Sequence, residues 1–143
     1  MEVAFEDDED IARIARTVKV IAVVGMSPKE WRPSWGVARY LQANGFRIIP
    51  VNPGHAGEKI LGETVYASLS DIPRSAGVQM VDIFRRSEAV GPVVEEALQH
   101  LPDLQSIWLQ LGVRNDAAAA RARAKGITVI QDRCPKIEFA RFL

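Results

Sequence analysis

Five short apolar runs recur along the chain, and turn residues separate them. They span residues 18–24, 47–51, 79–84, 106–111 and 127–130. An apolar run of this length is typical of a strand buried on both faces of a sheet. Helical stretches lie between most of the runs, and strands that alternate with crossover helices form parallel sheets. We therefore expect an α/β fold: a three-layer, Rossmann-like open parallel sheet of five strands in the order 3-2-1-4-5, with helices on both faces.

Five helices are expected, and most have a polar start and a glycine or proline stop. Their expected ranges are 8–17, 34–44, 87–100, 115–125 and 137–143. The helix at Asn115 has the clearest limits, because an asparagine cap precedes a run of alanines and Gly126 follows. The first and last helices belong to the chain ends, which we expect to meet. Residues 54–75 predict a loop with one helical turn near Leu69.

The first strand runs into a loop that opens a helix. This loop holds Gly25, Ser27, Arg32 and Ser34. A strand, a tight loop and a helix N-terminus together present backbone N–H groups and a positive dipole end, which suits a phosphate. Gly25 alone would equally fit a turn needed for close packing. The two serines add donors and favour a phosphorylated ligand.

The composition limits the class of ligand. The 143 residues fit one domain, and the formal net charge is zero. Six acids lie in residues 1–10, a segment we expect to be flexible, so residues 11–143 hold 18 basic against 12 acidic side chains. That basic excess is scattered, whereas a nucleic-acid-binding protein has a clustered stripe. No apolar run approaches the roughly 20 residues of a membrane span. We expect neither nucleic acid nor membrane as a partner.

The cysteine and histidines exclude several site types. A single cysteine, Cys134, allows no internal disulfide and no cysteine-based zinc cluster. His55 and His100 form no metal-binding pattern, so we expect no metal. The N-terminus lacks the basic and apolar regions of a signal peptide, which favours a cytoplasmic location. Cys134 has cationic neighbours that can make a thiol reactive, although a buried, inert cysteine is the more common case.

The residues after each strand matter most, because a parallel sheet binds its ligand beyond the carboxyl ends of the strands. A nicotinamide dinucleotide site needs G-x-G-x-x-G after the first strand and an acid after the second. Here Gly36 is the next glycine after Gly25, and the second strand is followed by Asn52. Neither G-x-S-x-G nor a Ser-His-Asp arrangement occurs, so no catalytic residue is expected.

Five segments in this order and spacing resemble a known family. They are Val-Val-Gly-Met-Ser with Arg-Pro-Ser at 23–34, Ile-Pro-Val-Asn-Pro at 49–53, Val-Asp-Ile-Phe-Arg-Arg at 81–86, Trp-Leu-Gln-Leu-Gly-Val at 108–113 and Asp-Arg-Cys-Pro-Lys-Ile-Glu at 132–138. The chain resembles the single-domain coenzyme A (CoA)-binding proteins, whose fold is shared with the CoA-binding domain of the succinyl-CoA synthetase alpha subunit. The resemblance covers residues 11–138 and implies CoA or acyl-CoA as ligand.

The resemblance also assigns residues to parts of the ligand. It implies Gly25, Met26, Ser27, Arg32 and Ser34 at the pyrophosphate, Val51, Asn52 and Pro53 at the adenine and ribose, Phe84, Arg85 and Val90 beside the nucleotide, and Gln110 and Gly112 toward the pantetheine. His55 stands where the synthetase domain has a lysine. A neutral imidazole is a weaker phosphate partner than lysine, so Lys59 or Arg85 are alternatives for that contact.

The resemblance leaves the activity open. In the synthetase, a following domain carries the phosphorylated histidine and a beta subunit supplies the nucleotide. This chain ends at Leu143, so we expect a CoA-binding protein without synthetase activity, acting alone, as a homodimer or with a partner enzyme subunit. One alternative is a subunit or redox partner of a CoA-using enzyme, with Cys134 reacting with the CoA thiol. The second is a regulator that binds NAD or ATP.

Overall fold

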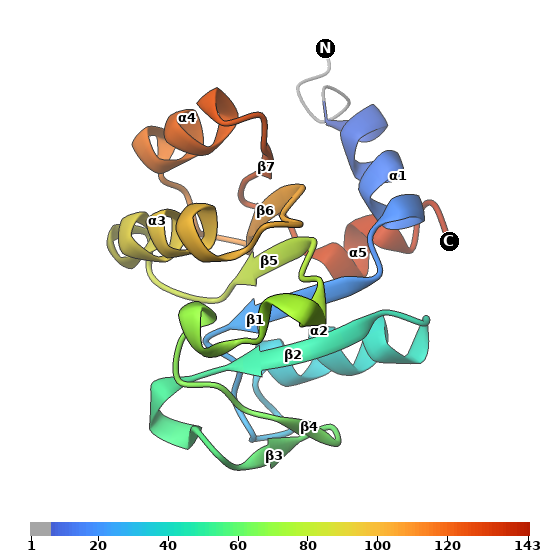
Figure 1. The fold of residues 1–143 in the computed structure, drawn as a ribbon. Helices are drawn as coiled ribbons and strands as arrows, with labels where there is room; N and C mark the ends of the chain where they lie inside the picture. Colours follow the sequence, from blue (N-terminus) through green and yellow to red (C-terminus); the bar gives the residue numbers. More distant parts are fainter. Residues whose placement is uncertain (1–6) are drawn as a thin grey trace.

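Five parallel strands form the central sheet in residues 7–143, which are the residues that the computed structural model describes (Figure 1). The strands are β1 Val20–Val24, β2 Arg47–Val51, β5 Met80–Ile83, β6 Ser106–Leu109 and β7 Thr128–Ile130. Every neighbouring pair is parallel. The predicted α/β class with a five-stranded parallel sheet is therefore confirmed.

The predicted strand order is wrong. The sheet runs β2-β1-β5-β6-β7, so the third long strand lies between the first and the fourth, not beside the second. The outer edge of β2 is already occupied, because Tyr66 forms a parallel bridge to Val51 and donates its backbone N–H to the Pro50 oxygen at 3.0 Å. The next strand of the central sheet, β5, pairs instead with the other side of β1.

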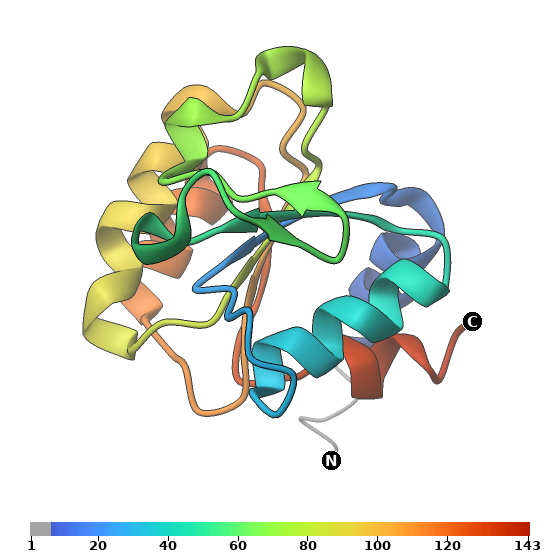
Figure 2. The ribbon, with the colours of Figure 1, turned by 90° about the horizontal axis from the view of Figure 1, so that it is seen from below.

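Helices cover both faces of the sheet (Figures 1 and 2). The α-helices of the described residues are α1 Asp8–Thr17, α2 Pro33–Ala43, α3 Val90–His100, α4 Asp116–Ala124 and α5 Pro135–Phe139. Helices α1, α2 and α5 pack on one face, where Ile21 and Val23 of β1 point, and α3 and α4 pack on the other, toward Ala22 and Val24. All five predicted helices are present, although a 3-10 turn over Ser87–Ala89 precedes α3, and the last helix begins two residues and ends four residues before its predicted limits.

The connection from β2 to β5 holds a hairpin that was not predicted. Its strands are β3 Lys59–Ile60 and β4 Glu63–Thr64, and they are antiparallel. The connection also holds 3-10 turns at Pro53–His55, Leu69–Asp71 and Arg74–Ala76. The helical turn expected near Leu69 is therefore confirmed, and the hairpin lies within the segment that was predicted as a loop.

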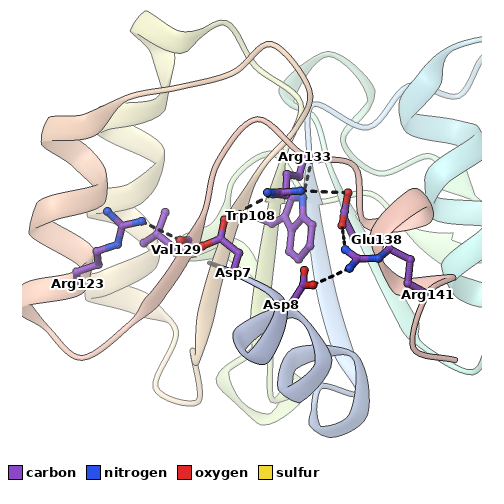
Figure 3. A network of polar contacts seen from close by, with 8 residues as sticks. All are labelled: Asp7, Asp8, Trp108, Arg123, Val129, Arg133, Glu138 and Arg141. Atoms are coloured by element: carbon purple, nitrogen blue, oxygen red, sulfur yellow. Dashed lines mark hydrogen bonds and ion pairs between the residues drawn. The ribbon is translucent and has the colours of Figure 1, made fainter. Parts of the chain in front are cut away.

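The two ends of the chain meet, as expected, through a network of charged side chains (Figure 3). Arg141 after α5 donates to Asp8 of α1 at 2.8 Å and to Glu138 at 2.7 Å. Arg133 pairs with Asp7 and with Glu138, each at 3.5 Å. Of the acidic segment 1–10, residues 8–10 form the first turn of α1, and residues 1–6 lie outside the described residues. In the described part of that segment, Asp7 thus directly precedes α1 and the other acids belong to the helix.

Asp82 is a fully buried carboxyl in the central strand β5. In register it lies between Val23 of β1 and Trp108 of β6, and neither of its carboxyl oxygens has a hydrogen-bond partner within residues 7–143. Burial raises the pKa of Asp82 well above the ordinary value, because the charged form loses its hydration. Asp82 therefore stays protonated over a pH range in which exposed aspartates are ionised.

This burial predicts a pH dependence of stability. The folded-state pKa of Asp82 is raised above the unfolded one, so the native state binds more protons between the two values. The free energy of unfolding therefore falls as pH rises through that range, by up to about 1.4 kcal/mol per pH unit. The Asp82→Asn variant has no titratable group at this position, so it lacks this contribution to the pH dependence. Urea unfolding from pH 4.5 to 7.5 should show the wild type losing stability relative to Asp82→Asn; parallel pH profiles would contradict the assignment.

Candidate functional site

A pocket of about 410 Å³ lies where β1, β2 and β5 end. Binding sites for small molecules commonly have volumes of about 300–1,000 Å³. The chain leaves β1 toward β2 on one side, while β5 pairs on the other, so the strand order reverses here, and such a switch point is where open parallel sheets bind ligands. We call it the switch-point pocket. It is lined by Gly25, Ser27, Lys29, Arg32, Pro33, Ser34, Asn52, His55 and Phe84.

Gly25 ends β1 in a turn that only glycine fits. Its φ is +83°, and a Cβ built on it would lie 2.3 Å from the Phe84 backbone oxygen. The N–H groups of Gly25 and Met26 both donate to the Val51 oxygen, at 2.9 and 3.3 Å. The chain therefore bends away from the sheet directly over the neighbouring strand ends, and this bend opens the pocket.

The two serines of the β1–α2 loop hold its backbone in place. The Ser34 hydroxyl oxygen accepts from the Ser27 N–H at 3.0 Å, and the Ser27 hydroxyl accepts from the Lys29 N–H at 3.1 Å. The sequence suggested that these hydroxyls add donors for a ligand. Each O–H hydrogen has no acceptor in residues 7–143, so each serine combines a structural role with a donor that can still face the pocket.

Asn52 joins the first two strand ends. Its side-chain amide donates to the Met26 oxygen at 2.8 Å, and its side-chain oxygen accepts from the Gly54 N–H at 2.9 Å. One side chain thus connects the loop after β1 to the 3-10 turn after β2. The wall of the pocket is built from satisfied backbone groups, which favours a fixed shape.

The pocket is electropositive. Lys29, Arg32 and His55 line it, and no acid does so among the described residues. The Arg32 guanidinium has no ion-pair or hydrogen-bond partner in residues 7–143, and the Lys29 ammonium contacts only the Trp31 ring, 5.5 Å from its centroid. The N-terminus of α2 adds a partial positive charge. This arrangement suits an anion with several oxygens.

Lys29 was not among the predicted site residues. It precedes the helix start by four residues and follows Ser27 by two, so its position in the phosphate-type loop was the available signal. Periodicity says nothing about the direction of a loop side chain. The contact of its ammonium with the exposed Trp31 ring is likewise visible only in three dimensions.

A second pocket of about 200 Å³ lies on the α3 side of the same strand ends, and we call it the α3-side pocket. It is lined by Val24, Val51, Pro53, Ala67, Ser68, Leu69, Arg85, Ala89, Val93 and Glu96. Most of these side chains are apolar, and Arg85 supplies a cation. The next residue, Arg86, is exposed and pairs with Glu88 at 3.3 Å.

Most of the predicted residues line one of these two pockets. The switch-point pocket contains Gly25, Ser27, Arg32, Ser34, Asn52, His55 and Phe84, the α3-side pocket contains Val51, Pro53 and Arg85, and neither contains Met26, Val90, Gln110 or Gly112. The Met26 and Val90 side chains are fully buried in the two cores. Lys59, the alternative to His55, lines neither pocket. Cys134 is buried in the core beneath α1, α2 and α5.

Gln110 and Gly112 lie further from Gly25 than the predicted strand order implied. That order placed the strand before Gln110 directly beside β1, but β5 lies between them. The Gly112 N–H donates to the Asp132 carboxylate at 2.7 Å, and the buried Gln110 side-chain oxygen has no partner within the described chain. Both residues lie on the same edge of the sheet as the pockets, one strand away.

A family model described as "CoA binding domain" matches residues 19–140. The chain belongs to this CoA-binding domain family. The uncharacterized protein YneT of Bacillus subtilis is 38% identical over 131 residues, which are 92% of this chain and 93% of that protein. A Thermus thermophilus structure, cell-free ID.343, matches with a TM-score of 0.87 and 34% identity over 95% of this chain and 98% of that one.

The same fold occurs within a larger enzyme. A dinucleotide-forming acetyl-CoA synthetase of Ca. Korarchaeum cryptofilum, solved with phosphate and ADP, matches with a TM-score of 0.66 and 21% identity. The match covers 82% of this chain and 27% of that chain. The predicted resemblance to CoA-binding domains is thus confirmed, and membership of the CoA-binding domain family supports a CoA-binding role.

Residues 7–143 contain neither a metal-binding cluster nor a membrane-spanning helix. No group of three or more histidine, cysteine or acidic side chains there could hold a metal ion. Within the same residues, no helix is long and apolar enough to cross a membrane.

The geometry of Gly25 predicts a sharp difference between two glycines. Gly25→Ala should destabilise the fold by at least about 2 kcal/mol, because a left-handed backbone and a clash with the Phe84 oxygen are combined. Gly36→Ala is the matched control, since its Cβ would meet open space within α2, and it should stabilise the protein by up to about 1 kcal/mol. Chemical denaturation measures both; equal effects would contradict the close approach.

Proposed function

We propose that this member of the CoA-binding domain family is a non-catalytic module that binds CoA or acyl-CoA, with the pyrophosphate in the switch-point pocket. The observation that carries the proposal is the pair of cations, Lys29 and Arg32, which have no ionic partner in residues 7–143 and line a switch-point pocket without acids. Charge-assisted hydrogen bonds to phosphate oxygens are the strong ones, and arginine binds two oxygens at once.

The α3-side pocket supports a site for the nucleotide. Consecutive residues of one strand end line the two pockets alternately: Val51 and Pro53 line the α3-side pocket, and Asn52 lines the switch-point pocket. A single extended ligand can therefore contact both pockets across the strand ends. Apolar side chains suit the faces of an adenine ring, and we assign Arg85 to a phosphate on the ribose.

The pantetheine arm would then run along the edge formed by the carboxyl ends of the strands, from β5 toward β6. From the switch-point pocket, the edge continues past β5 to β6 and the residues that follow it. Gln110 and Gly112 stand there, and we assign them to the pantetheine as the family resemblance implies. Met26 and Val90 serve the site through packing, because their side chains are buried.

The first test is a competition among CoA, NAD and ATP with the purified protein. Calorimetry and native mass spectrometry should detect CoA binding, preferred over the other two. Arg32→Gln should weaken CoA by about tenfold or more, since one charge-assisted phosphate contact is lost. Absence of CoA binding at millimolar concentration to folded protein would overturn the proposal, and preference for NAD or ATP would replace its ligand.

The adjacent arginines supply a matched pair of variants for the nucleotide side. Arg85 lines the α3-side pocket, whereas Arg86 is exposed and paired with Glu88. Arg85→Gln should weaken CoA by about tenfold, and Arg86→Gln should leave the affinity unchanged within about twofold. Titration of both variants with CoA and 3′-dephospho-CoA tests the contact further. If Arg85 meets the 3′-phosphate, its substitution weakens CoA more than dephospho-CoA.

A further inference from the structure

His55 gives the switch-point pocket one cation whose charge depends on pH. It ends the 3-10 turn that follows β2, and its side chain is 35% exposed. Lysine and arginine keep their charge at neutral pH, whereas histidine changes charge between about pH 5 and 8. The pocket thus combines two permanent cations, Lys29 and Arg32, with one titratable side chain.

Glu58 determines which nitrogen of His55 carries the proton. The Nδ1 atom lies 3.2 Å from both carboxylate oxygens of Glu58. An ionised carboxylate can only accept a hydrogen bond, so Nδ1 must be the protonated nitrogen. In the neutral ring, Nε2 is then an acceptor and cannot donate to a phosphate oxygen. Protonation of the ring converts Nε2 into a donor and adds a positive charge.

The charges around His55 come from two segments. From the loop after β1, Lys29 and Arg32 face the pocket; from its own loop, Glu58 faces the ring. The remaining polar and aromatic neighbours in the pocket, Asn52 and Phe84 among them, are uncharged. Glu58 is the charged side chain in contact with the ring, and a bound phosphate adds a second negative charge beside the two permanent cations.

We propose that His55 is a proton-linked phosphate ligand and that Glu58 is its positioning residue, so that the protein takes up a proton when it binds an anionic ligand. The proposal rests on the proposed function, because it concerns the same pocket. It adds a regulation that a lysine at this position could not give. Ligand affinity rises as pH falls, and the fixed tautomer makes the neutral ring inactive as a donor.

The test uses 3′-dephospho-CoA as well as CoA, because the phosphomonoester of CoA itself titrates near pH 6. Titration calorimetry at pH 6, 7 and 8 should show wild-type affinity for both ligands falling by about tenfold across the range, as one charge-assisted contact is lost. At pH 7, heats measured in two buffers of different ionisation enthalpy should reveal net proton uptake with dephospho-CoA.

Variants separate His55 from other groups. His55→Lys should bind both ligands with little pH dependence. It should take up no proton from the solvent when dephospho-CoA binds. His100→Gln is the matched control, since His100 is the last residue of α3 and lines neither pocket, and it should retain the wild-type pH profile. If His55→Lys kept the full pH dependence, the titrating group would lie elsewhere and the proposal would fail.

Two substitutions of Glu58 test the tautomer argument. Glu58→Asp keeps an ionised carboxylate, which can only accept from Nδ1–H, so the steep pH profile should persist. Glu58→Ala removes the acceptor, which allows the neutral ring to place its proton on Nε2 and donate to phosphate, so the profile should flatten by gaining affinity at pH 8. Identical profiles for the two variants would overturn the positioning role.

The outcome also distinguishes this inference from the proposed function. Wild-type protein could bind CoA with an affinity that does not change from pH 6 to 8, and take up no proton when dephospho-CoA binds. In that case the proton-linked role of His55 is wrong and the CoA proposal stands. If no CoA binds at any pH, the proposed function itself fails.

Discussion

The close approach between Gly25 and the Phe84 backbone oxygen is the constraint on which the site depends. A side chain at position 25 would lie 2.3 Å from that oxygen, so β1 can turn over the end of β5 only where Cβ is missing. The same turn lets two consecutive N–H groups share the Val51 oxygen. Three strand ends are thereby joined at one point, and the β1–α2 loop begins with a fixed direction.

The distribution of charge follows from how each cation is partnered. Near the chain ends, Arg133 and Arg141 are neutralised by Asp7, Asp8 and Glu138, which fasten α1 and α5 to the sheet (Figure 3). In the switch-point pocket, the loop serines and Asn52 satisfy the backbone, so no acid is needed there. The switch-point pocket therefore keeps Lys29 and Arg32 without an ionic partner in residues 7–143.

Sequence patterns predicted the elements better than their arrangement. Apolar runs located all five long strands, and Gly25 with the serine loop located the switch-point pocket, because both signals are local. Strand order depends on which edge of β1 is free, and the Tyr66 bridge that closes the edge of β2 has no local signature. The hairpin was missed because Leu61, with a φ of +52°, occupies a turn position where glycine or asparagine is typical.

The observed strand order changes how a family resemblance can be read onto this chain. With β5 beside β1, every cation of the two pockets comes from segments that follow β1, β2 or β5. Beyond β5, the edge offers the buried Gln110 oxygen, which is unpaired in residues 7–143, and the exposed Leu111. A phosphorylated ligand with a long uncharged arm fits this division, because its charges and its arm meet different strands. The proposed function therefore assigns the phosphates to the ends of β1, β2 and β5, where the cations lie, and the pantetheine to the end of β6.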